Sequence, residues 1–556
     1  MRHSLRITLF AVLLAALPVA RAADLLISNV NGYTLDSHGQ LQHFQALLVD
    51  RGKVVATGDT ATLTGQAGTA RVIDGHGHTL LPGLIDAHGH VLELGYARNS
   101  VDLSDTQSLG AALAKIKAYA AAHPDAKWIR GGGWNQEIWK LGRFPTAQEL
   151  DTAVPDRPVW LSRIDGHAAW ANSAAIKLAG VTMATQDPDG GRIERDADGN
   201  PAGVFVDGAT DLVNASVPAL TAQDQTAALD TALAEMARVG LTGVSDAGID
   251  LANYRLYRQY ADAHKLTARI YAMIRDTGPD FDAISKDGPL LGYGNDFLTV
   301  RAVKLFADGA LGSRGAAMLQ PYADDPHNRG LLFMPPATMT AKIEKAFAKG
   351  YQVGIHAIGD RANREVLDSY AAAYQAYPGA SALRNRVEHA QIVSLPDIPR
   401  FVTLHLIASM QPTHATSDMN MAEDRIGHER IKGAYAWQRF LQQGTVIAGG
   451  SDFPVESPNP FYGLYSAVTR EDHQGRPRGG WYPDQDLTFV QALRAFTLDA
   501  AYAEHAENTL GTLEPGKWAD FILIDHDVVK DPPGRIWDTQ VLQTWVGGKQ
   551  VYAARE

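Results

Sequence analysis

The sequence contains no cysteine among its 556 residues. Disulfide bonds are therefore excluded, and no thiolate can serve as a metal ligand. A bound metal would have to rely on histidine, carboxylate or some less usual ligand. A basic surplus is also missing, because 50 Lys and Arg residues stand against 62 Asp and Glu residues, with a formal net charge of -12. Since no Lys/Arg run offers a basic face to phosphates, we expect no nucleic-acid partner.

Long apolar runs are absent except at the N-terminus. Arg2 and Arg6 precede the stretch ITLFAVLLAALPVA, and Ala20 and Ala22 are the small residues that a signal peptidase reads. The run is shorter than the ~20 residues that span a bilayer. We therefore expect a signal peptide over residues 1–22 and no stable membrane anchor. An exported chain of this size without cysteine fits a bacterial periplasm, so the expected location is periplasmic or secreted.

Both ends of the mature chain are rich in short β-type segments separated by Gly, Asp and Asn turns. Residues 23–80 contain QALLVDRGKVVATG, and residues 506–556 contain GTLEPGKWADFILIDHD and VLQTWVGGKQVY. Neither end has helices to cover its strands. The sequence therefore predicts one small β-sandwich to which both ends contribute.

Residues 81–505 have a different pattern, in which apolar runs alternate with amphipathic helical stretches. The eight runs are LLPGLIDAHGHV, GLTGVSDAG, ARIYAMI, FLTVRAVKLFADG, YQVGIHAIGD, NRVEHAQIV, LIASMQPTH and TVIAGGSDFPV. Strands that alternate with helices form parallel βαβ units, and eight of them predict a (β/α)8 TIM barrel, an α/β fold.

An insertion of about residues 95–235 separates the first two barrel strands. It is too long for a loop and is expected to fold as a subdomain over the barrel mouth. Its aromatic residues Trp139, Phe144 and Trp170 could form a roof over an apolar substrate group or the core of the insertion itself. The sequence leaves both possibilities open.

Candidate metal ligands lie at the ends of the barrel strands, where barrel active sites are found. His88 and His90 end the first strand, two residues apart and therefore able to point to the same side. His356 ends the fifth strand, His389 lies in the sixth and Asp452 ends the eighth. A single histidine at such a place is often structural, but the set as a whole predicts a metal site. The nearby His-Gly-His at residues 76–78 lies among glycines and is expected to be a turn.

Lys304 lies in the fourth strand, where an apolar residue would fit. An ammonium beside a metal would be repelled, whereas two adjacent dications need an anionic bridge. Asp308, four residues further on, is the nearest carboxylate that could form such an anionic bridge. Lys304 could also extend its amine to solvent or pair with Asp308 as an ordinary salt bridge.

These motifs resemble the amidohydrolase superfamily, whose members join a metal-bearing (β/α)8 barrel to a small β-sandwich. The similar stretches are LLPGLIDAHGHV, the later strand-end histidines, GSD in the eighth strand and GTLEPGKWADFILID. VKLFADGALGSR, DGHAAWANSAAI and HAIGDRA resemble its family-3 branch, which includes N-substituted formamide deformylase. The resemblance covers nearly all of the mature chain.

The resemblance implies a site with two divalent metal ions, for which zinc is the usual occupant. It implies that CO2 converts Lys304 to a carbamate that bridges them. The implied ligands are His88, His90, Lys304 and Asp452 for the more buried ion, and the carbamate, His356 and His389 for the other.

The resemblance also implies roles in catalysis and substrate binding. Asp452 is expected to accept a proton from the attacking water. His167, in the DGH motif, is expected to donate to the substrate carbonyl. Trp134, His167 and Arg314 are the expected substrate-binding residues. For Trp134 and Arg314, packing in the insertion and bracing of a loop are open alternatives.

The expected activity is hydrolysis of a carbon–nitrogen, amide-type bond in a small molecule. A mononuclear deaminase is an alternative, but such enzymes normally have a glutamate soon after the strand-five histidine, and His356 is followed by AIGDR. A lactone or carbamate hydrolase and a non-catalytic binding protein on the same barrel are further alternatives. The expected partner is a small-molecule amide, and a homo-oligomer is possible.

Overall fold

The computed structural model describes residues 23–555 except residues 165, 167, 189 and 190. The predicted signal peptide lies outside these residues. Within the described part of the chain, no helix is long and apolar enough to cross a membrane.

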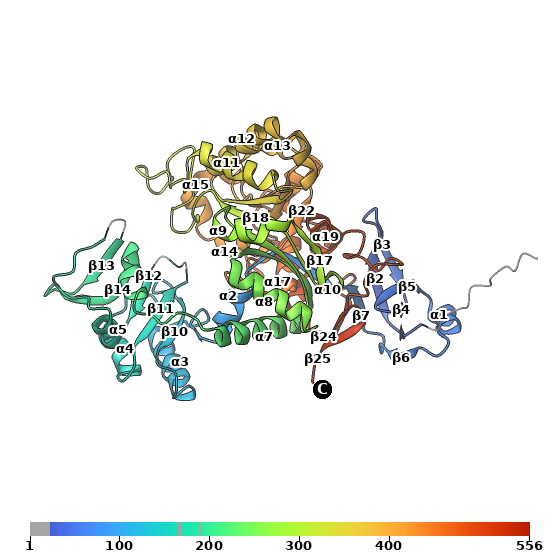
Figure 1. Ribbon diagram of the computed structural model, residues 1–556, viewed down its shortest axis with the longest axis horizontal. Coiled ribbons are helices and arrows are strands. Elements are labelled where there is room, and N and C mark those ends of the chain that lie inside the picture. The colour runs from blue at the N-terminus through green and yellow to red at the C-terminus, as the bar shows by residue number, and fades with distance from the viewer. Residues whose placement is uncertain (1–22, 165, 167, 189–190, 556) are drawn as a thin grey trace, which may run out of the picture.

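Eight parallel strands form the barrel at the centre of the molecule (Figure 1). They are β8 (Leu84–Gly89), β15 (Leu241–Ile249), β16 (Arg269–Arg275), β18 (Leu298–Phe306), β19 (Gln352–Ala357), β20 (Arg386–His389), β21 (Ile407–Met410) and β22 (Ile447–Gly449). Each pairs with the next in chain order, and a parallel bridge between Gly89 and Phe453 joins the last strand region to the first. The predicted barrel is confirmed.

Amphipathic helices cover the barrel because their apolar faces pack on its outer side. They include α7 (Ala222–Arg238), α8 (Leu251–Asp262), α11 (Pro336–Phe347), α12 (Asp360–Ala376), α13 (Ile398–Thr403), α16 (Trp437–Gln442), α18 (Phe489–Ala495) and α19 (Leu498–Ala503). In α7, for example, Leu229, Leu233 and Met236 are buried in the core that also holds residues of β15. Shorter helices follow some of the strand ends at the mouth, for example α2 (Val91–Arg98) after β8 and α14 (Pro412–Asp418) after β21.

Both ends of the chain contribute strands to a smaller β-structure beside the barrel (Figure 1). One sheet comes from the N-terminal part alone, with β5 (Lys53–Gly58), β4 (Ala46–Asp50), β1 (Leu25–Ser28) and β6 (Arg71–Asp74) in that order. The other sheet runs β25 (Lys549–Ala553), β24 (Val541–Val546), β23 (Phe521–Ile524), β7 (Thr79–Pro82), β2 (Asn31–Leu35) and β3 (Leu41–Phe44). The antiparallel pairing of β7 with β23 joins the two ends.

A buried ion pair connects this β-structure to the barrel. Arg269, at the start of β16, donates to both carboxylate oxygens of Asp520 at 2.6 and 2.9 Å. Arg269 also contacts the rings of Phe297 and Trp518. Because the guanidinium is buried, its charge depends on Asp520 for compensation.

The insertion folds around its own mixed sheet and stands to one side of the barrel (Figure 1). Its strands are ordered β13 (Gly191–Arg195), β14 (Pro201–Asp207), β12 (Ala168–Ala171), β11 (Val159–Arg163), β10 (Ile129–Trp134) and β9 (Val101–Asp102), with α3 (Leu109–Ala122), α4 (Ala147–Ala153) and α5 (Ser173–Leu178) beside them. Trp134, Trp139 and Trp170 form its buried core with Phe144 packed against them. Of the two open interpretations, the aromatic residues take the role of a core.

Candidate metal centre

His88 lies at the C-terminal end of β8 and is fully buried. A carboxylate fixes one nitrogen of its ring. Its Nδ1 donates to Glu388 Oε2 at 2.5 Å. Glu388 is itself held by the guanidinium of Arg386, whose Nε and Nη2 donate at 2.7 and 2.9 Å. A carboxylate on the far nitrogen of a histidine is the usual support of a metal ligand, since it fixes the tautomer. His88 therefore presents Nε2 to the centre of the barrel mouth.

Two other side chains lie close to this nitrogen. Lys304 Nζ is 3.0 Å from His88 Nε2, and Asp452 Oδ1 is 3.6 Å from it. The same carboxylate oxygen is 3.1 Å from His90 Nε2. One ligand atom each of His88, His389 and Asp452 can be chosen so that all three atoms lie within 4.8 Å of one another. The strand-end residues proposed as ligands are thus brought together as one cluster.

His356 and His389 form the other side of the cluster, with ring centroids 4.6 Å apart. Gln411 Oε1 accepts a hydrogen bond from His389 Nδ1 at 2.8 Å, so Nε2 is left for the centre. His356 Nε2 is buried without a hydrogen-bond partner among the described residues and lies 3.5 Å from Asp308 Oδ1. A buried nitrogen without a partner is costly, and a metal ion would satisfy it.

Backbone conformation helps to aim two of these side chains. His389 and Asp452 have φ values of 70° and 62°, in the left-handed region that only a few per cent of non-glycine residues adopt, Asn, Asp and His more often than the rest. Such conformations cluster at functional sites, where the surrounding structure holds them in place. Here the Asp452 amide donates to His88 O at 2.7 Å, so the end of β8 fixes the loop that follows β22.

The electrostatic setting keeps the imidazoles of His88, His356 and His389 neutral, whereas Asp452 raises the pKa of His90 despite its burial. Burial lowers the pKa of His88 to about 4 and that of His356 to about 3, and the positive charge of Lys304 acts in the same direction. Burial also lowers the pKa of the Lys304 ammonium to about 8, against Glu388 and Asp452, which favour the charged form. Burial alone would raise the pKa of Asp452, but the hydrogen bond from His90 and the nearby histidines lower it well below its usual value. Neutral imidazoles and an ionised carboxylate are the states that bind metal.

These residues fit a divalent metal ion. Nitrogen and oxygen donors converge, three of the histidines are held neutral, and the buried Nε2 atoms of His356 and His414 have no hydrogen-bond partner among the described residues. The cluster is closed on its inner side, where the side chains of His88 and Glu388 are fully buried. It opens to solvent on the side of His90 and His356, whose side chains are 23% and 15% exposed. A substrate would reach the ligands from that side.

Neither simple alternative for Lys304 matches its surroundings. Its side chain is fully buried, so the amine does not extend to solvent. Asp308 instead accepts hydrogen bonds from the backbone amides of Ala317, Ile358 and Gly359, and no ion pair joins it to Lys304 within the described residues. Burial raises the pKa of Asp308 to about 7. Asp308 thus supports the loop after β18 and the orientation of His356.

Two of the residues expected to bind substrate, Trp134 and Arg314, have other partners in the structure. Trp134 is fully buried in the core of the insertion and donates to Leu161 O, so it has no surface for a substrate. Arg314 forms an ion pair with Asp324 at 2.8 Å, which braces the loop after β18. These contacts match the structural alternatives for the two residues, and a contact of either with substrate stays a prediction. His167 lies outside the described residues, and its role stays a prediction. His76 and Gly77 form a turn, as expected.

Besides Gln411, sequence reasoning missed four residues around the cluster. Glu388 and Arg386 are two of them, and His414 is a third, with Nε2 3.7 Å from Asp452 Oδ2 and its ring stacked on His389. A histidine directly after the seventh strand, in MQPTH, was a signal that could have found it. The fourth is Arg275, the last residue of β16.

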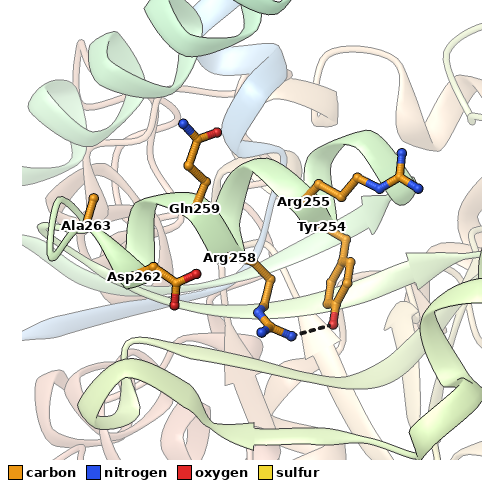
Figure 2. A pocket seen from close by; sticks show the side chains of 6 residues that line it. All are labelled: Tyr254, Arg255, Arg258, Gln259, Asp262 and Ala263. Atoms are coloured by element: carbon orange, nitrogen blue, oxygen red, sulfur yellow. Dashed lines mark hydrogen bonds between the residues drawn. The ribbon is translucent and has the colours of Figure 1, made fainter.

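A surface hollow on α8 is separate from this cluster. It is lined by Tyr254, Arg255, Arg258, Gln259, Asp262 and Ala263, all on one outer helix or at its end (Figure 2). The only hydrogen bond drawn in Figure 2 joins Arg258 to the Tyr254 hydroxyl, at 3.1 Å. None of its residues is a candidate ligand, so it has no part in the site.

Comparison with known proteins agrees with this geometry. A crystal structure of an uncharacterized metal-dependent hydrolase from Pyrococcus horikoshii OT3 is 27% identical, with a TM-score of 0.76, and the match covers 92% of this chain and 99% of that one. Protein LONG AFTER FAR-RED 3 of Arabidopsis thaliana is 34% identical over 96% of this chain and 92% of its own length. N-substituted formamide deformylase of Arthrobacter pascens is 30% identical over 94% of this chain and 97% of its own.

The barrel, the ligand cluster and these similarities define a metal-dependent hydrolase that acts on carbon–nitrogen bonds. Within that class the chain belongs to the amidohydrolase family, whose family model (Amidohydro_3) matches residues 71–552. The resemblance noted in the sequence is confirmed.

Proposed function

We propose that the protein hydrolyses an amide-type carbon–nitrogen bond of a small molecule with a metal-activated water. The observation that carries this proposal is the convergence of His88, His389 and Asp452 ligand atoms within 4.8 Å, beside a buried lysine at the barrel mouth. One relative is named an N-substituted formamide deformylase, which supports an amide-type substrate.

The donor set supports two divalent ions, with zinc as the usual occupant of nitrogen and oxygen sites. His88, His90, Lys304 and Asp452 would hold the inner ion, and His356 and His389 the outer one. Lys304 would bridge the two as a carbamate: its neutral amine attacks CO2, a C–N bond forms, and the nitrogen releases one proton. The lowered pKa of Lys304 supports this step because it increases the neutral fraction.

Bound divalent ions would lower the pKa of a water and polarise the scissile carbonyl. Asp452 would take the proton of the attacking water. In support of this role, one of its carboxylate oxygens faces His88 and His90 and the other faces His414. Asp452 would then pass the proton to the leaving nitrogen. Glu388 would keep His88 in the tautomer that presents Nε2.

Substitution of Asp452 tests this assignment. Asp452→Asn should lower kcat by about 10²–10⁴-fold, the usual loss for a general acid–base group, while most of the metal stays bound through the histidines. Metal content per chain and steady-state rates measure the two effects. Asp198→Asn, in an exposed turn of the insertion, is the matched control. Full activity of Asp452→Asn would refute the role.

The substrate class is tested by a screen of the metal-loaded protein against N-formyl amines, N-acyl amino acids, aryl amides and lactones. Hydrolysis of amides with two ions per chain is the expected result. A single ion together with ammonia release from amino-heterocycles would favour a deaminase. Turnover confined to lactones would favour a lactone hydrolase.

A further inference from the structure

Arg275 ends β16 directly beside the metal cluster. In the parallel pairing of β16 with β18, Arg275 is the register partner of Lys304. Two and four residues earlier in the same strand, Met273 and Tyr271 are packed inside the barrel with Ala247 and Ala302. Because alternate residues of a strand share a face, Arg275 belongs to the inward-facing set and forms its outermost layer.

The surroundings of Arg275 leave its charge available. The residue is exposed, and its guanidinium carbon lies 5.6 Å from the centroid of the Phe306 ring. Phe306 in turn lies 5.8 Å from His356 and 5.1 Å from Lys304 Nζ. The guanidinium is thus separated from the candidate ligands by one aromatic ring.

No carboxylate compensates this arginine within the described residues. The neighbouring Asp276 is engaged with Lys342 at 2.5 Å and with the amide of Thr277 at 2.6 Å. Asp308, which follows the neighbouring strand β18, is occupied by three backbone amides. Arg314, the arginine expected from the sequence to meet substrate, is in contrast paired with Asp324.

From this position we propose that Arg275 binds a carboxylate of the substrate, and that the enzyme therefore prefers amides carrying a carboxylate near the scissile bond, as N-acyl amino acids do. A guanidinium offers two parallel donors that match a carboxylate, and the Phe306 ring holds it flat by a cation–π contact. The inference rests on the proposed amide hydrolysis, and Arg275 acts as a specificity-determining residue.

The experiment compares matched substrate pairs with the zinc-loaded full-length protein. Each pair is an N-acetyl amino acid and its carboxamide, with glycine, alanine, leucine, phenylalanine and lysine as the amino acid. The wild type should show a higher kcat/KM for the carboxylate members. Arg275→Met should lower kcat/KM for those members by about 10- to 100-fold, the loss of hydrogen bonds to a charged group, and leave the carboxamides nearly unchanged. Arg275→Lys should fall between.

Arg255→Met is the matched control, because Arg255 is an exposed arginine on the outer helix α8 (Figure 2). It removes the same net charge from the outer surface of α8 and should not change the preference. Equal kcat/KM for both members of each pair in the wild type, or the same preference in Arg275→Met, would overturn the inference while amide hydrolysis itself stood.

Calorimetric binding of the same pairs separates the two proposals. Tighter binding of the carboxylate members, lost in Arg275→Met, together with no turnover of any amide would refute the proposed function and keep the role of Arg275. Equal affinity for the carboxylate and carboxamide members of each pair would refute the role of Arg275, whether or not turnover is seen. Metal content and circular dichroism of Arg275→Met confirm that the variant is folded and loaded.

Discussion

Replacement of Glu388 by glutamine should weaken both metal binding and the fold. The substitution keeps the shape of the side chain and removes its charge. His88 Nδ1 loses a carboxylate at 2.5 Å, and Arg386 loses the only carboxylate that it contacts among the described residues, leaving neutral partners such as Ser245 Oγ and Ser409 Oγ. Loss of a carboxylate behind a metal-ligating histidine costs about 10- to 100-fold in metal affinity. An uncompensated buried charge costs about 3–5 kcal/mol.

Two assays on the purified protein separate these effects. Zinc affinity is measured by competition with a chelator, and stability by the melting temperature of the metal-free form. In Arg386→Met/Glu388→Met the charge pair is replaced by apolar groups, so stability should largely return. Zinc affinity should stay low because methionine does not replace the carboxylate that accepts from His88 Nδ1. Wild-type zinc affinity in Glu388→Gln, or its full recovery in the double variant, would refute this account of the support for His88.

Two predictions concern stability away from the metal cluster. Asp520→Asn leaves Arg269 buried without its carboxylate, so the unfolding free energy should fall by about 3–5 kcal/mol; a melting temperature equal to that of the wild type would contradict this. Glu504 is buried against Ser245 Oγ, and burial raises its pKa to about 7. Its contribution to stability is therefore fully present below its ordinary pKa of 4.5 and is lost as the pH rises through 7. Glu504→Gln should therefore exceed the wild type in stability by up to about 3 kcal/mol at pH 8 and match it at pH 4.5; an equal difference at both values would exclude titration of Glu504 as the cause.

The sequence was sufficient for the barrel because each strand is a short apolar run bounded by glycine or a polar residue. Parallel strands buried on both faces produce that pattern, and the helices between them show a different period. The candidate ligands followed because the strands of such a barrel end at one mouth. His88, His356 and Asp452 could be grouped in this way before any distance was known.

The supporting residues could not be predicted, for a geometric reason. Strict alternation would place Glu388 and His389 on opposite faces of β20. The positive φ of His389 breaks the alternation, so both side chains serve the same cluster. His414 depends in a similar way on where the chain turns after β21. Trp134 was ambiguous because a pocket wall and a hydrophobic core call for the same kind of residue.

The pairing of β7 with β23 sets an order of events during synthesis. β7 leaves the ribosome early, whereas β23 follows only after the whole barrel has been made. In the interval one edge of β7 has no neighbour, and an unpaired edge is a template for association with other chains. A chain that stops before Phe521 would keep that edge permanently, so nonsense mutations near the end of the gene should yield aggregated protein even though every candidate ligand has already been made.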